Sequence, residues 1–170
     1  MFAIVKDGAI TKTGPSLRGL FPNVSFPASG PDNDWKTTEG VKEIVKGVQK
    51  DQQYYFVTEG DITLVDGVPT QQYTNTAKRL ADETIDGVIS QGLKSVMTEQ
   101  VKVTANKLLS NTDWMVIRKA ERDVAIPSAT VTYRAAVITE CARLESAIAG
   151  AGDVDALATV MAAQNWPTES

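Results

Sequence analysis

Apolar and polar positions follow different patterns in the two halves of this chain. Up to Thr74 the apolar residues form short β-rich runs with a period near two, separated by turn residues. Beyond Asn75 they recur at spacings of three and four, the period of an amphipathic helix. The pattern predicts an α+β protein, with a small N-terminal antiparallel β domain over residues 1–74 and a helical domain over residues 75–170.

Strand and turn signals in the first half predict about five or six short strands. Asp7-Gly8 and Asp66-Gly67 each separate two β-rich runs, which is the signal for a two-residue hairpin turn. The turn-rich segment from Pro15 to Trp35 predicts an ordered loop with one short helical turn near Leu17. Its expected anchors are the aromatic residues Phe21, Phe26 and Trp35.

The helical half begins with an apolar pattern that predicts one helix over about residues 75–110, or two helices joined near Gly87 to Gly92. A helix of about 35 residues would span about 50 Å, so part of it should project or pack on another chain. Further helices are predicted at about 113–123, 129–149 and 153–164, forming a C-terminal hairpin or bundle. Their expected start and stop signals are Thr112 or Asn111, Pro127, Ser128 and Asp153.

The candidate packing or interface residues are the apolar positions of the long helix and the aromatic residues at the helix joints. Trp114 and Tyr133 flank the Ile126-Pro127 break, which favours a wedge that packs two helices together. The long apolar stripe fits two interpretations equally well: packing on the three later helices, or association with a partner helix. The full set is Leu93, Val96, Met97, Val101, Leu108, Trp114, Tyr133, Arg134 and Trp166.

Composition argues against several classes of function. Histidine is absent, which removes the commonest general base and transition-metal ligand. A single cysteine, Cys141, allows no intrachain disulfide and is expected to behave as a small core hydrophobe. The net charge of −4, without a Lys/Arg cluster, disfavours nucleic acid. No signal peptide and no membrane-spanning run are apparent. We therefore expect no catalytic residue, cofactor, metal or membrane partner.

Two acidic clusters could suggest metal or hydrolytic chemistry. Asp82, Glu83 and Asp86 fall on the first turns of the predicted long helix, where a solvated face beside the apolar stripe is the simpler interpretation. Asp32 to Asp34 fails as a calcium loop, because a lysine and a threonine follow where a ligand and a glycine are required. Turn chemistry explains that cluster better.

Several short motifs of the second half occur in a recognisable order. They are Leu108-Leu109, Thr112-Asp113-Trp114 with Arg118 and Glu121 on the same helix, Ile126-Pro127, Tyr133-Arg134 and Trp166-Pro167. In this order they resemble the C-terminal region of phage tail and tail-fibre assembly chaperone proteins. The resemblance covers about a third of the chain. The chain departs from that pattern in an alanine-rich segment after Ala136 and an extra helix before Trp166.

The resemblance implies a non-enzymatic bacteriophage tail or tail-fibre accessory protein, an assembly chaperone or adaptor. Its partner would be a fibre or baseplate polypeptide, with homo-oligomerisation to a dimer or trimer as a further expectation. The alternative is a permanent structural component of the virion, assembled through a helical bundle. The expected location is the host cytoplasm during assembly, or the virion tail if the protein stays.

Overall fold

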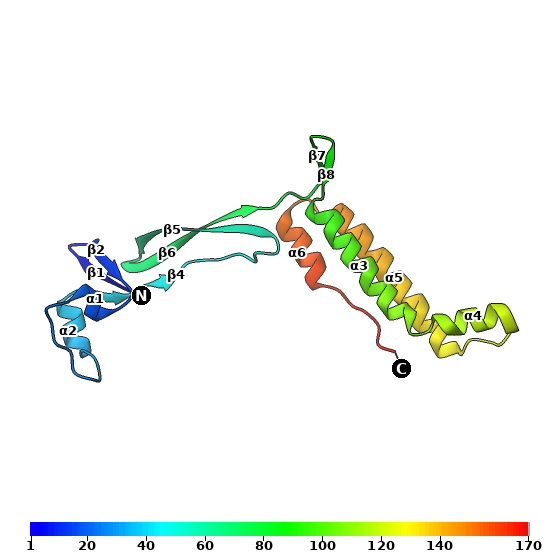
Figure 1. Cartoon of the computed structure of the whole chain (residues 1–170), viewed down its shortest axis with the longest axis horizontal. Coiled ribbons are helices and arrows are strands. Elements are labelled where there is room, and N and C mark those ends of the chain that lie inside the picture. Colours follow the sequence, from blue (N-terminus) through cyan, green and yellow to red (C-terminus); the bar gives the residue numbers. More distant parts are fainter. Residues whose placement is uncertain (170) are drawn as a thin grey trace. The chain divides into compact units, whose positions relative to one another are not determined.

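The computed structural model describes residues 1–169 and divides the chain into two compact units, Met1–Thr76 and Ala77–Ser170. The first unit is built of strands with two short helices, and the second of a short hairpin and four helices (Figure 1). The predicted α+β class, with sheets first and packed helices afterwards, is confirmed.

A three-stranded antiparallel sheet opens the first unit. Its strands are β1 (Phe2–Lys6), β2 (Ala9–Gly14) and β3 (Val41–Glu43), in the order β2-β1-β3. Asp7 and Gly8 both have positive φ, 52° and 74°, the conformation that a type I′ hairpin turn requires. The hairpin predicted from this dipeptide is confirmed.

Two short helices and an aromatic cluster organise the turn-rich segment that follows. The helices are α1 (Leu17–Leu20) and α2 (Asn33–Thr38). Asp32 caps α2, because its carboxylate accepts a 2.7 Å hydrogen bond from the backbone N–H of Trp35. The Trp35 ring contacts Phe21 and Phe26 edge-on, with centroids 4.9 and 5.1 Å away. The aromatic anchor is confirmed, but the sequence pattern missed α2.

The second sheet of this unit is mixed rather than wholly antiparallel. Its strands are β4 (Val45–Lys46), β5 (Tyr55–Val65) and β6 (Val68–Ala77), in the order β4-β6-β5. The short β4 pairs with β6 in parallel. Asp66-Gly67 joins β5 to β6, again with two positive φ angles, as expected for a two-residue turn.

The prediction of one long helix over residues 75–110 is wrong. The first half of that range consists of the end of β6 and a third hairpin, formed by β7 (Glu83–Ile85) and β8 (Val88–Ser90). The helix itself, α3 (Leu93–Ser110), has 18 residues and is about 27 Å long. The alternative of a break near Gly87 to Gly92 is closer to the structure, but a hairpin precedes the break, not a helix.

The three later helices lie close to their predicted positions. They are α4 (Asp113–Arg122), α5 (Ser128–Gly150) and α6 (Val154–Ala162). Helices α3 and α5 run side by side, and α6 packs on α5 (Figure 1). Asp153 caps α6 as predicted, because its carboxylate accepts a hydrogen bond from the N–H of Ala156.

The core of the second unit is formed by one stripe from each of three helices. On α3 the buried residues recur every fourth position, on the same face of the helix. This stripe is therefore largely covered within one chain. The length of the helix no longer argues for a partner chain. The buried residues are Leu93, Met97, Val101 and Ala105 on α3, Tyr133, Val137, Glu140, Leu144 and Ile148 on α5, and Val154, Leu157 and Met161 on α6.

Candidate functional site

Three of the motifs that carry the resemblance, Leu108-Leu109, Thr112-Asp113 and Tyr133-Arg134, meet at the joint between α3, α4 and α5. The Arg134 guanidinium donates hydrogen bonds to the Leu109 carbonyl (2.9 Å) and the Thr112 hydroxyl (2.7 Å). The same nitrogen lies 2.9 Å from a carboxylate oxygen of Asp113. Thr112 is fully buried and closes the end of α3 through a bond to Leu109. One arginine of α5 therefore fixes both the end of α3 and the start of α4, and we call these residues the joint.

A small apolar cluster between α3 and α5 packs next to the joint. Tyr133, Val137 and Ala105 are buried together, and the Tyr133 hydroxyl lies 3.4 Å from the Leu108 carbonyl. Partly buried side chains pack against this cluster: Leu108, Leu109, Cys141 and Trp166. Four of the nine predicted packing residues, Leu108, Tyr133, Arg134 and Trp166, thus lie in one place, although they are up to about 60 positions apart in the chain.

A buried carboxylate that the sequence analysis overlooked holds the C-terminal segment on α5. Both Glu140 oxygens accept 2.7 Å hydrogen bonds from Arg143, and one also accepts a 2.8 Å bond from the backbone N–H of Asn165. Arg143 further donates to the Ala163 carbonyl. These bonds hold the pKa of Glu140 below its ordinary value, and the hydrogen bonds from Arg143 have the largest effect. A glutamate on an apolar stripe, three residues before an arginine, was the available sequence signal.

Two predicted packing residues lie outside the core. Trp114 is 52% exposed, so it is not the helix–helix wedge that its position suggested. The Arg118 guanidinium instead lies over its ring, 4.8 Å from the centroid, in a cation–π contact. Val96 is 43% exposed, beside the buried stripe of α3, and does not belong to an apolar seam.

Helix α4 as a whole has no buried residue and is held to the unit mainly through the joint. Yet it is strongly amphipathic, and Ile117, three residues after Trp114, is 55% exposed. We call Trp114, Ile117 and the stacked Arg118 the α4 face. It is an exposed apolar surface on a firmly attached helix.

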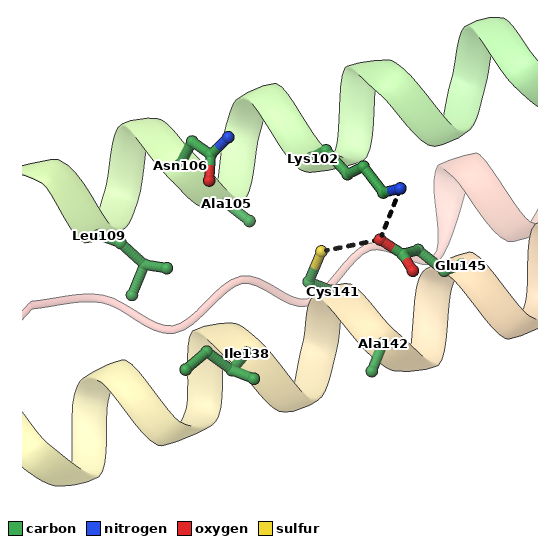
Figure 2. Close-up of a pocket in the computed structure, with 8 residues that line it drawn as sticks. All are labelled: Lys102, Ala105, Asn106, Leu109, Ile138, Cys141, Ala142 and Glu145. Carbon is green, nitrogen blue, oxygen red and sulfur yellow. Dashed lines mark hydrogen bonds and ion pairs between the residues drawn. The ribbon is translucent and has the colours of Figure 1, made fainter.

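An open groove runs between α3 and α5, with a volume of about 370 Å³ (Figure 2). Ala105, Asn106 and Leu109 line it from α3, and Ile138, Cys141 and Ala142 from α5. Lys102 and Glu145 form a loose ion pair across one end, 3.8 Å apart. We call this hollow the α3–α5 groove.

Cys141 is partly buried in the wall of this groove, so the prediction of a core thiol holds only in part. Burial raises the pKa of the thiol above its ordinary value, and the neighbouring Glu145 carboxylate adds to the shift. A thiol of raised pKa is mostly protonated at neutral pH and is a poor nucleophile.

The acidic residues predicted on a solvated helix face have separate structural roles. Asp82 accepts hydrogen bonds from the Gly92 N–H (2.7 Å) and the Ser95 hydroxyl (2.9 Å), which caps the start of α3. These bonds lower the pKa of Asp82, and the bond from the Gly92 N–H has the largest effect. Glu83 pairs with Arg79, and Asp86 forms the β7–β8 turn. Within residues 1–169 no three acidic or cysteine side chains converge on a common point where a metal ion could sit.

The described part of the chain contains no helix with the length and apolarity that a membrane span requires. In comparisons with known proteins, no family model, curated protein or solved structure matches this chain.

Proposed function

We propose that this chain is a non-enzymatic phage tail or tail-fibre accessory protein that binds a fibre or baseplate polypeptide through the α4 face. The motif order supports the class of protein, and the exposed Trp114 on a helix without buried residues supports the surface. The exposure of Trp114 carries the proposal, because it leaves an aromatic residue of the motif available to bind a partner.

The geometry separates the motif residues into two roles. The joint residues Thr112, Asp113 and Arg134 hold α4, while Trp114 and Ile117 remain available on its outer face. Large aromatic side chains dominate the binding energy of many protein interfaces, since they bury much area with few rotatable bonds. A helix fixed at its start loses less conformational entropy on binding than a mobile one.

The test is co-expression of the full chain with the fibre and baseplate polypeptides encoded beside it, followed by affinity capture. Trp114→Ala should reduce capture at least tenfold while the melting temperature stays nearly unchanged. Val103→Ala is the matched control, since Val103 is exposed on α3, away from α4. Equal capture by the wild type and Trp114→Ala, or no capture of any tail polypeptide, would contradict the proposal.

The same system separates a transient chaperone from a permanent virion component. Mass spectrometry of purified virions should find a chaperone absent or far below the copy number of its partner. Stoichiometric presence would favour the structural alternative, in which the α4 face stays bound in the finished tail.

A further inference from the structure

The β7–β8 hairpin presents an apolar surface that nothing in its own unit covers. Ile85, Val88 and Ile89 are 51%, 69% and 68% exposed, although the strands contain only three residues each. Ile85 and Val88 pair across the hairpin, and Ile89 pairs with Thr84. Both sides of this short ribbon therefore present branched aliphatic side chains to solvent.

The base of the hairpin is firmly held. The Arg79 guanidinium donates to the carbonyl (3.0 Å) and hydroxyl (2.9 Å) of Ser90 at the end of β8 and pairs with Glu83 at the start of β7. The carbonyls of Arg79 and Leu80 accept bonds from the first backbone N–H groups of α3. An isolated two-stranded hairpin is only marginally stable in water, so these contacts keep the apolar tip in place.

The second unit also carries a hollow of matching chemistry, the α3–α5 groove, with apolar walls and a volume of about 370 Å³. On α3 the groove is lined from Lys102 to Leu109, which lie nine and sixteen positions after Leu93, the first residue of the helix. Its centre thus lies about 20 Å along the helix, about twice the length of a three-residue strand. The hairpin cannot reach the groove of its own chain while its base is held.

We propose that the β7–β8 hairpin of one copy docks into the α3–α5 groove of a second copy. Branched side chains of the hairpin would replace water against Leu109, Ile138 and Ala142. The charges agree with this placement: Asp86 at the hairpin tip has no cationic partner among residues 1–169, and Lys102 is half-exposed at the groove. Loosely paired surface charges such as Lys102 and Glu145 exchange partners at little cost.

Such a contact joins two different surfaces, so two copies can exchange hairpins reciprocally in a dimer, or more copies can form a ring. None of the α4 face residues Trp114, Ile117 and Arg118 lines the groove. Self-association through the hairpin and binding of a tail polypeptide through α4 are therefore separable, and each can fail without the other.

The single native cysteine provides a direct test, because Cys141 lines the groove. In the full-length chain, Val88→Cys should give a disulfide-linked species under mild oxidation that is lost in the Val88→Cys/Cys141→Ala double variant. Val103→Cys, exposed on the outer face of α3, should cross-link far less and is the control. Equal cross-linking of the two cysteine variants, or a cross-link that survives loss of Cys141, would overturn the proposal.

Sedimentation of the unoxidised protein provides an independent measurement. The wild-type chain should self-associate, and Val88→Asp and Ile138→Asp should each weaken association at least tenfold. Both positions are exposed, so folding should be unaffected. A mixture of the two variants should recover a complex, because the intact hairpin of one fits the intact groove of the other. A wild-type monomer at all concentrations, or no recovery on mixing, would refute the docking.

Discussion

At the scale of single residues, position on the helix decides the role of each apolar side chain. Val96 and Val101 lie on the same helix five residues apart, but Val101 is inaccessible to solvent and Val96 is not. One valine belongs to the core and the other to the surface, although the spacing pattern of the sequence includes both.

The two valines yield opposite predictions for the same substitution. Val101→Asp should lower the free energy of unfolding by several kcal/mol, roughly 3 or more, because it buries an unpaired charge. Val96→Asp should change it by about 0.5 kcal/mol or less, as usual for surface positions. Urea unfolding of both variants checks this. Similar losses at both positions would mean that Val96 is covered in solution.

Glu140 should make the stability of the helical unit depend on pH in the acid range. Its pKa is lowered from 4.5 in the folded state, so its carboxylate stabilises the fold above that value and loses this effect as the pH falls through the folded pKa. Glu140→Gln should cost about 1–3 kcal/mol at pH 7, as for a lost charged hydrogen bond. Unfolding curves at pH 7 and pH 3 should show the difference between wild type and variant shrinking. A difference that is equal at both pH values would contradict this role.

At the scale of elements, the joint determines whether α4 is a rigid surface or a mobile one. Arg134→Lys keeps the charge, but the lysine ammonium lies one bond closer to the backbone than the Arg134 nitrogen that contacts Leu109, Thr112 and Asp113, so it cannot reach all three. Hydrogen exchange should therefore accelerate in α4 while α3 and α5 stay protected. The control Arg122→Lys, at the exposed far end of α4, should leave exchange unchanged. Unaltered protection of α4 in Arg134→Lys would show that other contacts hold the helix.

The sequence predicted the three later helices because each has local start and stop signals, such as Asp153 and Pro127. It failed at β7–β8 because Ile85, Val88 and Ile89 are spaced three and four apart along a tight hairpin, which imitates a helix face. The turn dipeptide Asp86-Gly87 was the better signal, with φ angles of 51° and 80°. The same kind of dipeptide correctly marked the two earlier hairpins.

The candidate site was predicted only in part, for a reason of helix geometry. Thr112 and Trp114 are two residues apart, so on a helical path their side chains point in nearly opposite directions. Thr112 faces Arg134 and is buried, whereas Trp114 faces outward. Motif spacing alone cannot tell which residue of such a pair is buried. The direction depends on where α5 lies.

At the scale of the whole molecule, the chain consists of two units with separate cores, dividing at Thr76. The fragment 77–170 contains the hairpin base, the joint and the Glu140 contacts in full. We therefore expect it to fold alone and to melt cooperatively at nearly the temperature of the same unit in the full chain. Calorimetry of the fragment and the full chain checks this, and a fragment without a cooperative transition would mean that the units depend on each other.

The proposed function of this protein is the binding of a tail polypeptide through the α4 face. Hydrogen exchange of the full chain, with and without the purified fibre or baseplate polypeptide, tests it most directly. Partner binding should produce new protection within Asp113–Arg122, and Trp114→Ala should abolish it. Protection confined to other segments, or none at saturating partner concentration, would contradict it.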